Sequence, residues 1–269
     1  MSTSVVERTS DAPAIVVYAH RERARNLVKS AFPRRRTRIV LTRTFEDFEA
    51  AFKTHLVDAA VVDVGGAQEE TWRTAALARE YPSAPFFALA PLRATEGPAL
   101  AQCANFEFAD VLVDGVDDGA ARDLVAHASY TSRFSRALDN PPRVLGLSTP
   151  LQQNAWRFIV SHGGRSVRTS TLAEVLSVTR EHLSRSFSAA GAPNLKRIID
   201  LVRIIAAAEL AKNPGYDLRD VSTILAFASS SHLSSTAMRV VGTKPTSLTR
   251  LRTVDLIERF IKGHGRSRG

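Results

Sequence analysis

The sequence has a single cysteine, Cys103, among its 269 residues. An intramolecular disulfide is therefore impossible, and a metal site built from several cysteines is excluded. The seven histidines are scattered without the spacing of metal ligands. No run of about 18 apolar residues occurs, and the first residues lack the charged-then-apolar layout of a signal peptide. These absences predict a cytoplasmic protein with no membrane partner, no metal and no cofactor.

Catalytic groupings are also missing. The pair Gly65-Gly66 predicts a turn and not a phosphate-binding loop, because no Gly-Lys-Ser/Thr follows it. No combination of serine, histidine and aspartate at defensible spacing is found. We therefore expect that the protein is not an enzyme and that it has no catalytic residues.

Positive charge is concentrated in one half of the chain. Residues 1–130 hold 15 Lys and Arg against 18 Asp and Glu, whereas residues 131–269 hold 21 against 9. A basic half joined to a mildly acidic half favours a polyanionic partner for the basic half alone, although a basic domain without a nucleic-acid partner has the same composition. The run Arg34-Arg-Arg-Thr-Arg38 lies in the other half and is interpreted as a solvated charge run.

The first half alternates between strand-like and helix-like patterns. Strand-like apolar runs occupy residues 14–18, 38–42, 59–64, 85–89 and 111–113. Helical periodicity occupies residues 21–31, 45–55, 69–80, 96–105 and 118–129. Five strands that alternate with helices predict an α/β fold, a doubly wound five-stranded parallel sheet of the receiver or flavodoxin type.

The second half is predicted to be entirely helical. The prolines in Asp139-Asn-Pro-Pro-Arg143 mark a linker. Thr171 and Glu174 have the spacing of a capping box, a long helix is expected over residues 194–212, and a last helix over 246–261. The predicted segments are a flexible N-terminus (1–12), an α/β domain (13–130), a helical and proline-containing linker (131–147), an all-helical domain (148–252), and a basic C-terminal helix and tail (253–269).

A short pattern occurs twice in the helical half. Residues 172–187, followed by Gly191, and residues 221–237, followed by Gly242, each read as a short apolar helix, a tight turn and a second helix. The second helices contain His182-Leu183-Ser184 and His232-Leu233-Ser234. The pattern is a helix-turn-helix written twice, which points to double-stranded DNA.

Residues 148–252 resemble the AraC/XylS family of transcription activators. The order is the same: a first helix-turn-helix, a long connecting helix, and a second helix-turn-helix that closes near Gly242 and Pro245. The resemblance implies that both units enter successive major grooves on one face of DNA, about 34 Å apart. It also implies action at the bacterial nucleoid.

The exposed face of each second helix is the candidate base-contacting surface. Leu183 and Phe187 are spaced to seat the first of these helices on its partner. Arginine and glutamate side chains can discriminate between base edges. Serine hydroxyls are permissive, because their contacts are short and ambiguous. By resemblance, Arg180, Glu181, Ser184 and Arg185 occupy the base-contacting positions of the first unit, and Thr179 lies on the same predicted face. The second unit departs from the family pattern, and its predicted base-contacting residues are Ser230, Ser231, Ser234 and Ser235. We therefore expect the first unit to read sequence and the second mainly to grip the backbone.

Phosphate contacts are expected from neighbouring polar and basic side chains. The candidates are Thr171, Lys196, Arg197, Arg203 and Arg239. Each true contact steepens the log–log dependence of affinity on salt by about 0.9.

The first half resembles the receiver domain of two-component regulators, with Asp63 at the phospho-acceptor position. A receiver has an acidic pair after the first strand, which holds a divalent cation, but Tyr18-Ala19-His20-Arg21 stands there. It also has Ser or Thr after the fourth strand and Lys after the fifth, where this chain has Ala90 and Asp114. We expect a degenerate receiver in which nothing compensates the charge of Asp63 and an incoming phosphoryl group, and in which Asp63 is structural.

Together these features predict a sequence-specific transcription regulator whose pseudo-receiver serves dimerisation or input from a signal or partner. The candidate protein partners are a second copy of the chain, through the N-terminal domain, and RNA polymerase or a regulatory protein. Three alternatives remain open. They are a response regulator phosphorylated on Asp63, a protein–protein adaptor with weak non-specific DNA binding, and a small-molecule pocket at the carboxyl ends of the strands.

Overall fold

The computed structural model describes residues 12–32, 37–189 and 192–265. The expected flexible N-terminus (apart from its last residue), the arginines 34–36, Gly191 and the end of the basic tail lie outside the described residues. The chain forms two compact units, Met1–Ser132 and Arg133–Gly269.

The first unit is a five-stranded parallel sheet with the strand order β2-β1-β3-β4-β5. Its strands are β1 (Ala14–Tyr18), β2 (Arg38–Thr42), β3 (Val57–Asp63), β4 (Phe86–Pro91) and β5 (Phe108–Asp114). Its helices are α1 (Glu22–Ala31), α2 (Phe45–Thr54), α3 (Glu69–Ala76), α4 (Gly97–Cys103) and α5 (Ala121–Ala128). This order is the doubly wound arrangement shared by flavodoxin and receiver domains, and the predicted fold class is confirmed.

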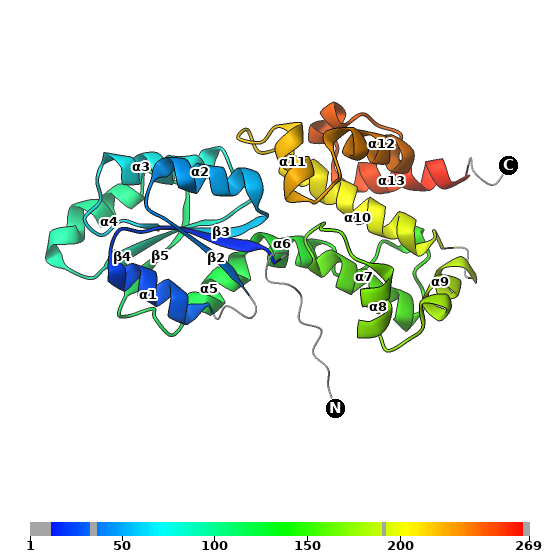
Figure 1. The fold of residues 1–269 in the computed structure, drawn as a ribbon, viewed down its shortest axis with the longest axis horizontal. Coiled ribbons are helices and arrows are strands. Elements are labelled where there is room, and N and C mark those ends of the chain that lie inside the picture. The colour runs from blue at the N-terminus through cyan, green and yellow to red at the C-terminus, as the bar shows by residue number, and fades with distance from the viewer. Residues whose placement is uncertain (1–11, 33–36, 190–191, 266–269) are drawn as a thin grey trace. The chain divides into compact units, whose positions relative to one another are not determined.

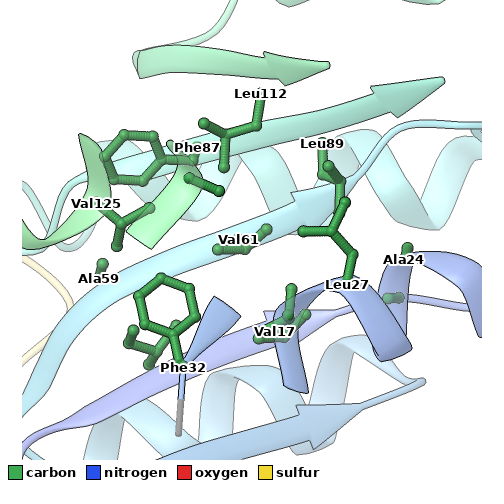
Figure 2. Close-up of a cluster of buried hydrophobic side chains, with 14 residues drawn as sticks. Val17, Ala24, Leu27, Phe32, Ala59, Val61, Phe87, Leu89, Leu112 and Val125 are labelled. Atoms are coloured by element: carbon green, nitrogen blue, oxygen red, sulfur yellow. The ribbon is translucent and has the colours of Figure 1, made fainter. Parts of the chain in front are cut away.

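Two hydrophobic layers enclose the sheet. Helices α1 and α5 pack on one face, where Leu27 and Val125 meet Val61 and Phe87 (Figure 2). Helices α2 and α3 lie over the opposite face (Figure 1). There Phe86 stacks on Phe52 of α2, because neighbouring residues of a strand point to opposite faces.

The element boundaries differ from the sequence prediction mainly at the edge of the sheet. Strand β5 begins before the predicted residue 111. The prediction is too short because Ala109 and Asp110 are exposed and do not continue the apolar run. The helix expected over residues 96–105 is instead a 3-10 turn, Ala94–Glu96, followed by the short α4.

The regular elements in the described residues of the second unit are all helices, with turns and loops between them. It contains α7 (Pro150–Ser161), α8 (Thr169–Val175), α9 (Arg180–Ala189), α10 (Leu195–Leu210), α11 (Leu218–Ile224), α12 (Ser230–Val241) and α13 (Thr253–Gly265). A further helix, α6 (Tyr130–Ala137), spans the boundary between the units. Thirteen of the sixteen residues of α10 are buried, so this helix is the core around which the others pack (Figure 1).

Two predictions about helix ends are wrong. Helix α8 begins at Thr169 with Arg168 as its N-cap, so Thr171 lies inside the first turn and cannot form a capping box with Glu174. The helix expected over residues 246–261 is divided into a 3-10 turn, Pro245–Arg250, and α13. The division follows from an extended Leu251 and from Asp255, whose carboxylate accepts the Arg252 amide at 2.9 Å before α13 begins.

Candidate nucleic-acid interface

Two helix-turn-helix units are present, formed by α8 with α9 and by α11 with α12. Both turns contain a residue with positive φ, 54° at Ser177 and 52° at Ala226. The next amide in each turn reaches back into the first helix, Val178 to the Ala173 carbonyl and Phe227 to the Ser222 carbonyl. The two turns therefore share one backbone design.

The second turn is one residue longer than the first. In the first unit Thr179 is the cap of α9 and follows Val178 directly; its hydroxyl accepts the amide of His182 at 3.1 Å. In the second unit Ala228 is inserted between Phe227 and the cap Ser229, which accepts the amide of His232 at 3.1 Å.

The predicted reading face of α9 is exposed as one stripe. Leu183 and Phe187 are fully buried beneath the helix and fix its orientation. The exposed residues of the predicted set are Thr179, Arg180, Glu181, Ser184 and Arg185. In α9 the spacing of these residues is close to the 3.6-residue period of a helix, which aligns their side chains. The unit thus presents two guanidinium groups and one carboxylate on a seated helix.

Serines cover the corresponding face of α12. Ser231 and Ser235 are exposed, while Ser230 and Ser234 are half-buried. The hydroxyls of Ser234 and Ser235 donate to carbonyls of their own helix, at 2.9 and 3.0 Å. Their donors are engaged within the helix, so this face offers mainly acceptor oxygens.

The predicted phosphate contacts differ in their availability. Lys196 is exposed on α10, whereas Thr171 and Arg197 are half-buried. The Arg197 guanidinium lies 5.0 Å from the centroid of the Phe260 ring. Arg239 is exposed, but it donates to the buried carboxylate of Asp200 at 2.9 Å. Lys196 is therefore the most available cation in this set.

Arg203 is the prediction that the structure contradicts. The residue is 6% exposed, and its Nη2 donates to the carbonyls of Leu225 and Ala226 at 3.1 and 3.2 Å. Burial lowers the pKa of its guanidinium, and the charge of Asp200 opposes that shift. Arg203 cannot reach a phosphate, because its side chain is directed into the protein from a helix that is buried on nearly all sides.

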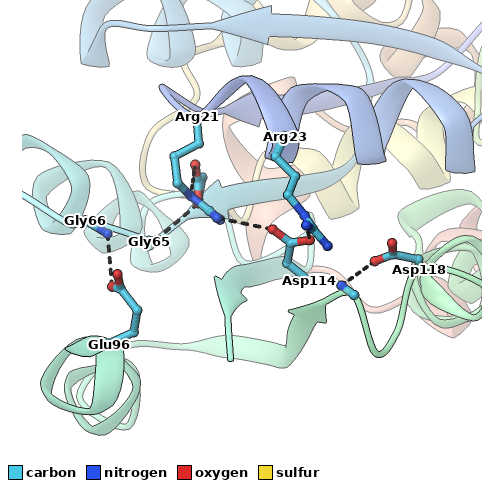
Figure 3. A network of polar contacts seen from close by, with 9 residues as sticks. Arg21, Arg23, Gly65, Gly66, Glu96, Asp114 and Asp118 are labelled. Atoms are coloured by element: carbon cyan, nitrogen blue, oxygen red, sulfur yellow. Dashed lines mark hydrogen bonds and ion pairs between the residues drawn. The ribbon is translucent and has the colours of Figure 1, made fainter. Parts of the chain in front are cut away.

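The receiver-like unit has its ionic cluster at the carboxyl ends of the strands (Figure 3). Arg21 Nε donates to both oxygens of Asp63, at 2.9 and 3.0 Å, and Nη2 donates to Oδ1. Arg21 Nη1 reaches Asp114 at 3.2 Å, and Arg23 Nε donates to the same carboxylate at 2.6 Å. The side chains of Asp63 and Asp114 are only 1% and 2% exposed.

The signs of the charges are reversed relative to a receiver. An arginine, Arg21, follows β1 in place of the acidic pair, and a carboxylate, Asp114, ends β5 in place of the lysine. Arg21 compensates the charge of Asp63 itself, a contact that the sequence does not predict. Gly65 is required beside them, since a Cβ at that position would collide with the Arg21 guanidinium and the Pro91 ring.

The pKa values reflect this burial. Desolvation raises the pKa of Asp63 above its usual value, although the hydrogen bonds and charge of Arg21 oppose the shift. Desolvation alone lowers the pKa of Arg21, but its contacts with Asp63 and then Asp114 outweigh that effect and raise it. The guanidinium is thus firmly charged and remains at the position where a receiver binds its cation.

Backbone amides near this edge are bonded to carboxylates of the chain itself. The Gly66 amide donates to Glu96 at 3.0 Å, and the Gly115 amide donates to Asp118 at 2.7 Å (Figure 3). The Val113 amide donates to Asp117 at 2.7 Å. These amides are therefore engaged and do not form an open anion site.

No group of three or more His, Cys, Asp or Glu residues with the geometry to hold a metal ion occurs in the part of the chain that the structure describes. No described helix is long and apolar enough to span a membrane.

Comparison with known proteins identifies the class of the second unit. Residues 172–250 match the family model described as a helix-turn-helix domain. This match agrees with the AraC-type resemblance, and the chain thus carries a DNA-binding domain of the class found in transcription regulators, together with a receiver-like α/β unit. The crystal structure of full-length FixJ from B. japonicum is similar at 14% identity and a TM-score of 0.36, over 76% of this chain and 97% of that one. No curated protein matches the chain.

Sequence reasoning missed the ionic cluster. The sequence places Asp63, Arg21 and Asp114 near the ends of predicted strands, but their pairing depends on which strand ends lie side by side. In the sheet, β1, β3, β4 and β5 are neighbours, so their carboxyl ends lie at the same edge. The contact between these residues could not be predicted, because they are far apart in the sequence. The signal available in the sequence was the substitution of opposite charges at two receiver positions.

Proposed function

We propose that the chain is a sequence-specific DNA-binding transcription regulator in which the first helix-turn-helix reads bases and the second mainly grips the backbone. The observation that supports this most is the exposed stripe of α9, with Arg180, Glu181 and Arg185 above the buried Leu183. Arginine pairs bidentately with guanine and glutamate accepts from cytosine. The serines of α12 supply acceptors, which suit weaker base discrimination.

Selection of bound sequences from a random duplex pool, read at two salt concentrations, tests this proposal. We expect an asymmetric, bipartite motif with one strong half and one weak half. Binding without any enriched sequence would instead favour the adaptor with non-specific DNA affinity.

We also propose that the receiver-like unit is a pseudo-receiver that acts through protein contact, as a dimerisation surface or as the docking site of a regulatory protein or RNA polymerase. Arg21 is hydrogen-bonded to Asp63 where a divalent cation would be needed, and a fixed cation repels a second one. Asp63 also has its two oxygens engaged by Arg21 and by the Gly65 amide.

Incubation with a small phosphodonor and magnesium, followed by intact-mass measurement, distinguishes this role from the conventional response regulator. The proposal predicts no added phosphoryl mass on the wild-type chain. Stoichiometric labelling that disappears in Asp63→Asn would falsify it and would restore the phosphorylation-dependent alternative.

A further inference from the structure

Arg203 is a buried cation whose hydrogen bonds go to the turn of the second helix-turn-helix. It extends from α10, and its Nη2 donates to Leu225 and Ala226, the two carbonyls at the end of α11. The last carbonyls of a helix have no partner within the helix and carry partial negative charge, so a guanidinium stabilises them. Burying an arginine without a directly bonded carboxylate is costly, and the position therefore has a specific task.

The turn that Arg203 contacts is the longer of the two, and like the first it contains a residue with positive φ. Ala226 has a φ of 52°, a conformation that costs a non-glycine residue free energy. The inserted Ala228 lengthens the turn by one residue and so increases the conformational freedom of the backbone before α12 starts. A hydrogen-bonded anchor from a rigid helix offsets both effects by fixing the path of the chain.

Side chains on both sides complete the anchor. The Arg203 guanidinium lies 3.7 Å from the centroid of the Phe227 ring, which meets the His232 ring edge to face at 5.7 Å. His232 belongs to α12, and its Nδ1 lies 3.4 Å from the amide of the inserted Ala228. The series Arg203, Phe227 and His232 thus connects the core helix α10 with the first turn of α12.

We infer that Arg203 is a positioning residue for DNA binding, which sets the orientation of α12 toward the duplex without touching DNA itself. This role rests on the proposed function. It makes Arg203 the residue on which DNA binding by the second helix-turn-helix depends. Removing Arg203 should free the turn, so that α12 no longer engages its groove while α9 still does.

The test compares affinities of the full-length protein for the selected duplex and for a duplex shortened to lack the second half of the site. In the wild type we expect the shortened duplex to bind about tenfold more weakly or worse, with a flatter salt dependence. In Arg203→Met the ratio of the two affinities should fall toward one, and the salt slope on the full duplex should approach the wild-type slope on the shortened one. Arg203→Lys, which retains a cationic donor, should recover much of the ratio.

Lys212→Met is the matched control, because it removes a cation just beyond the end of the same helix, where Lys212 pairs with Glu209 at 2.7 Å. It should keep the wild-type ratio. Hydrogen exchange in Arg203→Met should accelerate over residues 225–241 and remain unchanged over residues 172–187.

An unchanged affinity ratio in Arg203→Met, or equal acceleration of exchange in both units, would overturn the inference. A wild-type ratio of one would also overturn it while leaving the reading by α9 intact. Failure of the wild type to bind either duplex would refute the proposed function itself, before any variant is measured.

Discussion

Replacement of Arg21 by alanine tests the ionic cluster of the receiver-like unit. The side chain of Arg21 is 25% exposed, whereas Asp63 and Asp114 are almost completely buried. Removing one partner of a buried ion pair typically costs about 3–5 kcal/mol, because a charge is left uncompensated. Arg23 retains one contact with Asp114, and the partial exposure of Arg21 admits water, so we expect about 3 kcal/mol.

Native-state hydrogen exchange of the amides in β1 and β3 measures this loss in the unit concerned. Arg23→Ala is the control, because its side chain is 67% exposed and reaches only Asp114 within the cluster. It should cost about 1 kcal/mol or less. The double variant Arg21→Ala with Asp63→Asn should be more stable than Arg21→Ala alone, because the buried charge is removed with its partner. A loss below about 1 kcal/mol in Arg21→Ala would refute the reasoning, since it would mean that Asp63 needs no counterion.

Other expected outcomes concern DNA binding and pH. Arg185→Ala should relax base preference at one position by about 1–3 kcal/mol, whereas Lys196→Ala should weaken all sequences alike; equal behaviour of the two variants in pool selection would contradict this division. Lys196→Ala should also reduce the log–log salt slope by about 0.9, while Arg239→Ala should change it little because its guanidinium is engaged by Asp200; a larger reduction in Arg239→Ala would show that this pair opens on DNA. The raised pKa of Asp63 means that the folded unit binds its proton more tightly than the unfolded chain does. The resulting stabilisation is full below the unfolded pKa and is lost as pH rises through the folded one, so urea unfolding should show this decline in the wild type and not in Asp63→Asn.

The fold class followed from the sequence because its signals are local. Continuous apolar runs such as residues 59–64 marked buried parallel strands, and β3 is buried at six of its seven positions. The edge strand β5 was underestimated because its exposed residues break the apolar run. The buried face of α9 is also predictable from local sequence, because Leu183 and Phe187 are spaced about one helical turn apart.

The roles of individual arginines did not follow from the sequence. Arg203 and Lys196 lie on the same helix, yet Arg203 is buried against a turn more than 20 residues away and Lys196 is exposed. Only tertiary packing distinguishes a buried, structural cation from one that is available to phosphates. The same limitation concealed the contact of Arg21 with Asp63, whose sequence separation is 42 residues.

Recognition of a specific DNA sequence is the property on which the proposed function depends most. Its most direct test is the ratio of dissociation constants for the selected duplex and for a scrambled duplex of the same length and composition, measured at about 0.15 M salt, the physiological ionic strength. We expect the selected duplex to bind about 10³-fold tighter or more. A ratio near one, with both affinities falling steeply in salt, would contradict it and leave a protein that grips only the phosphate backbone.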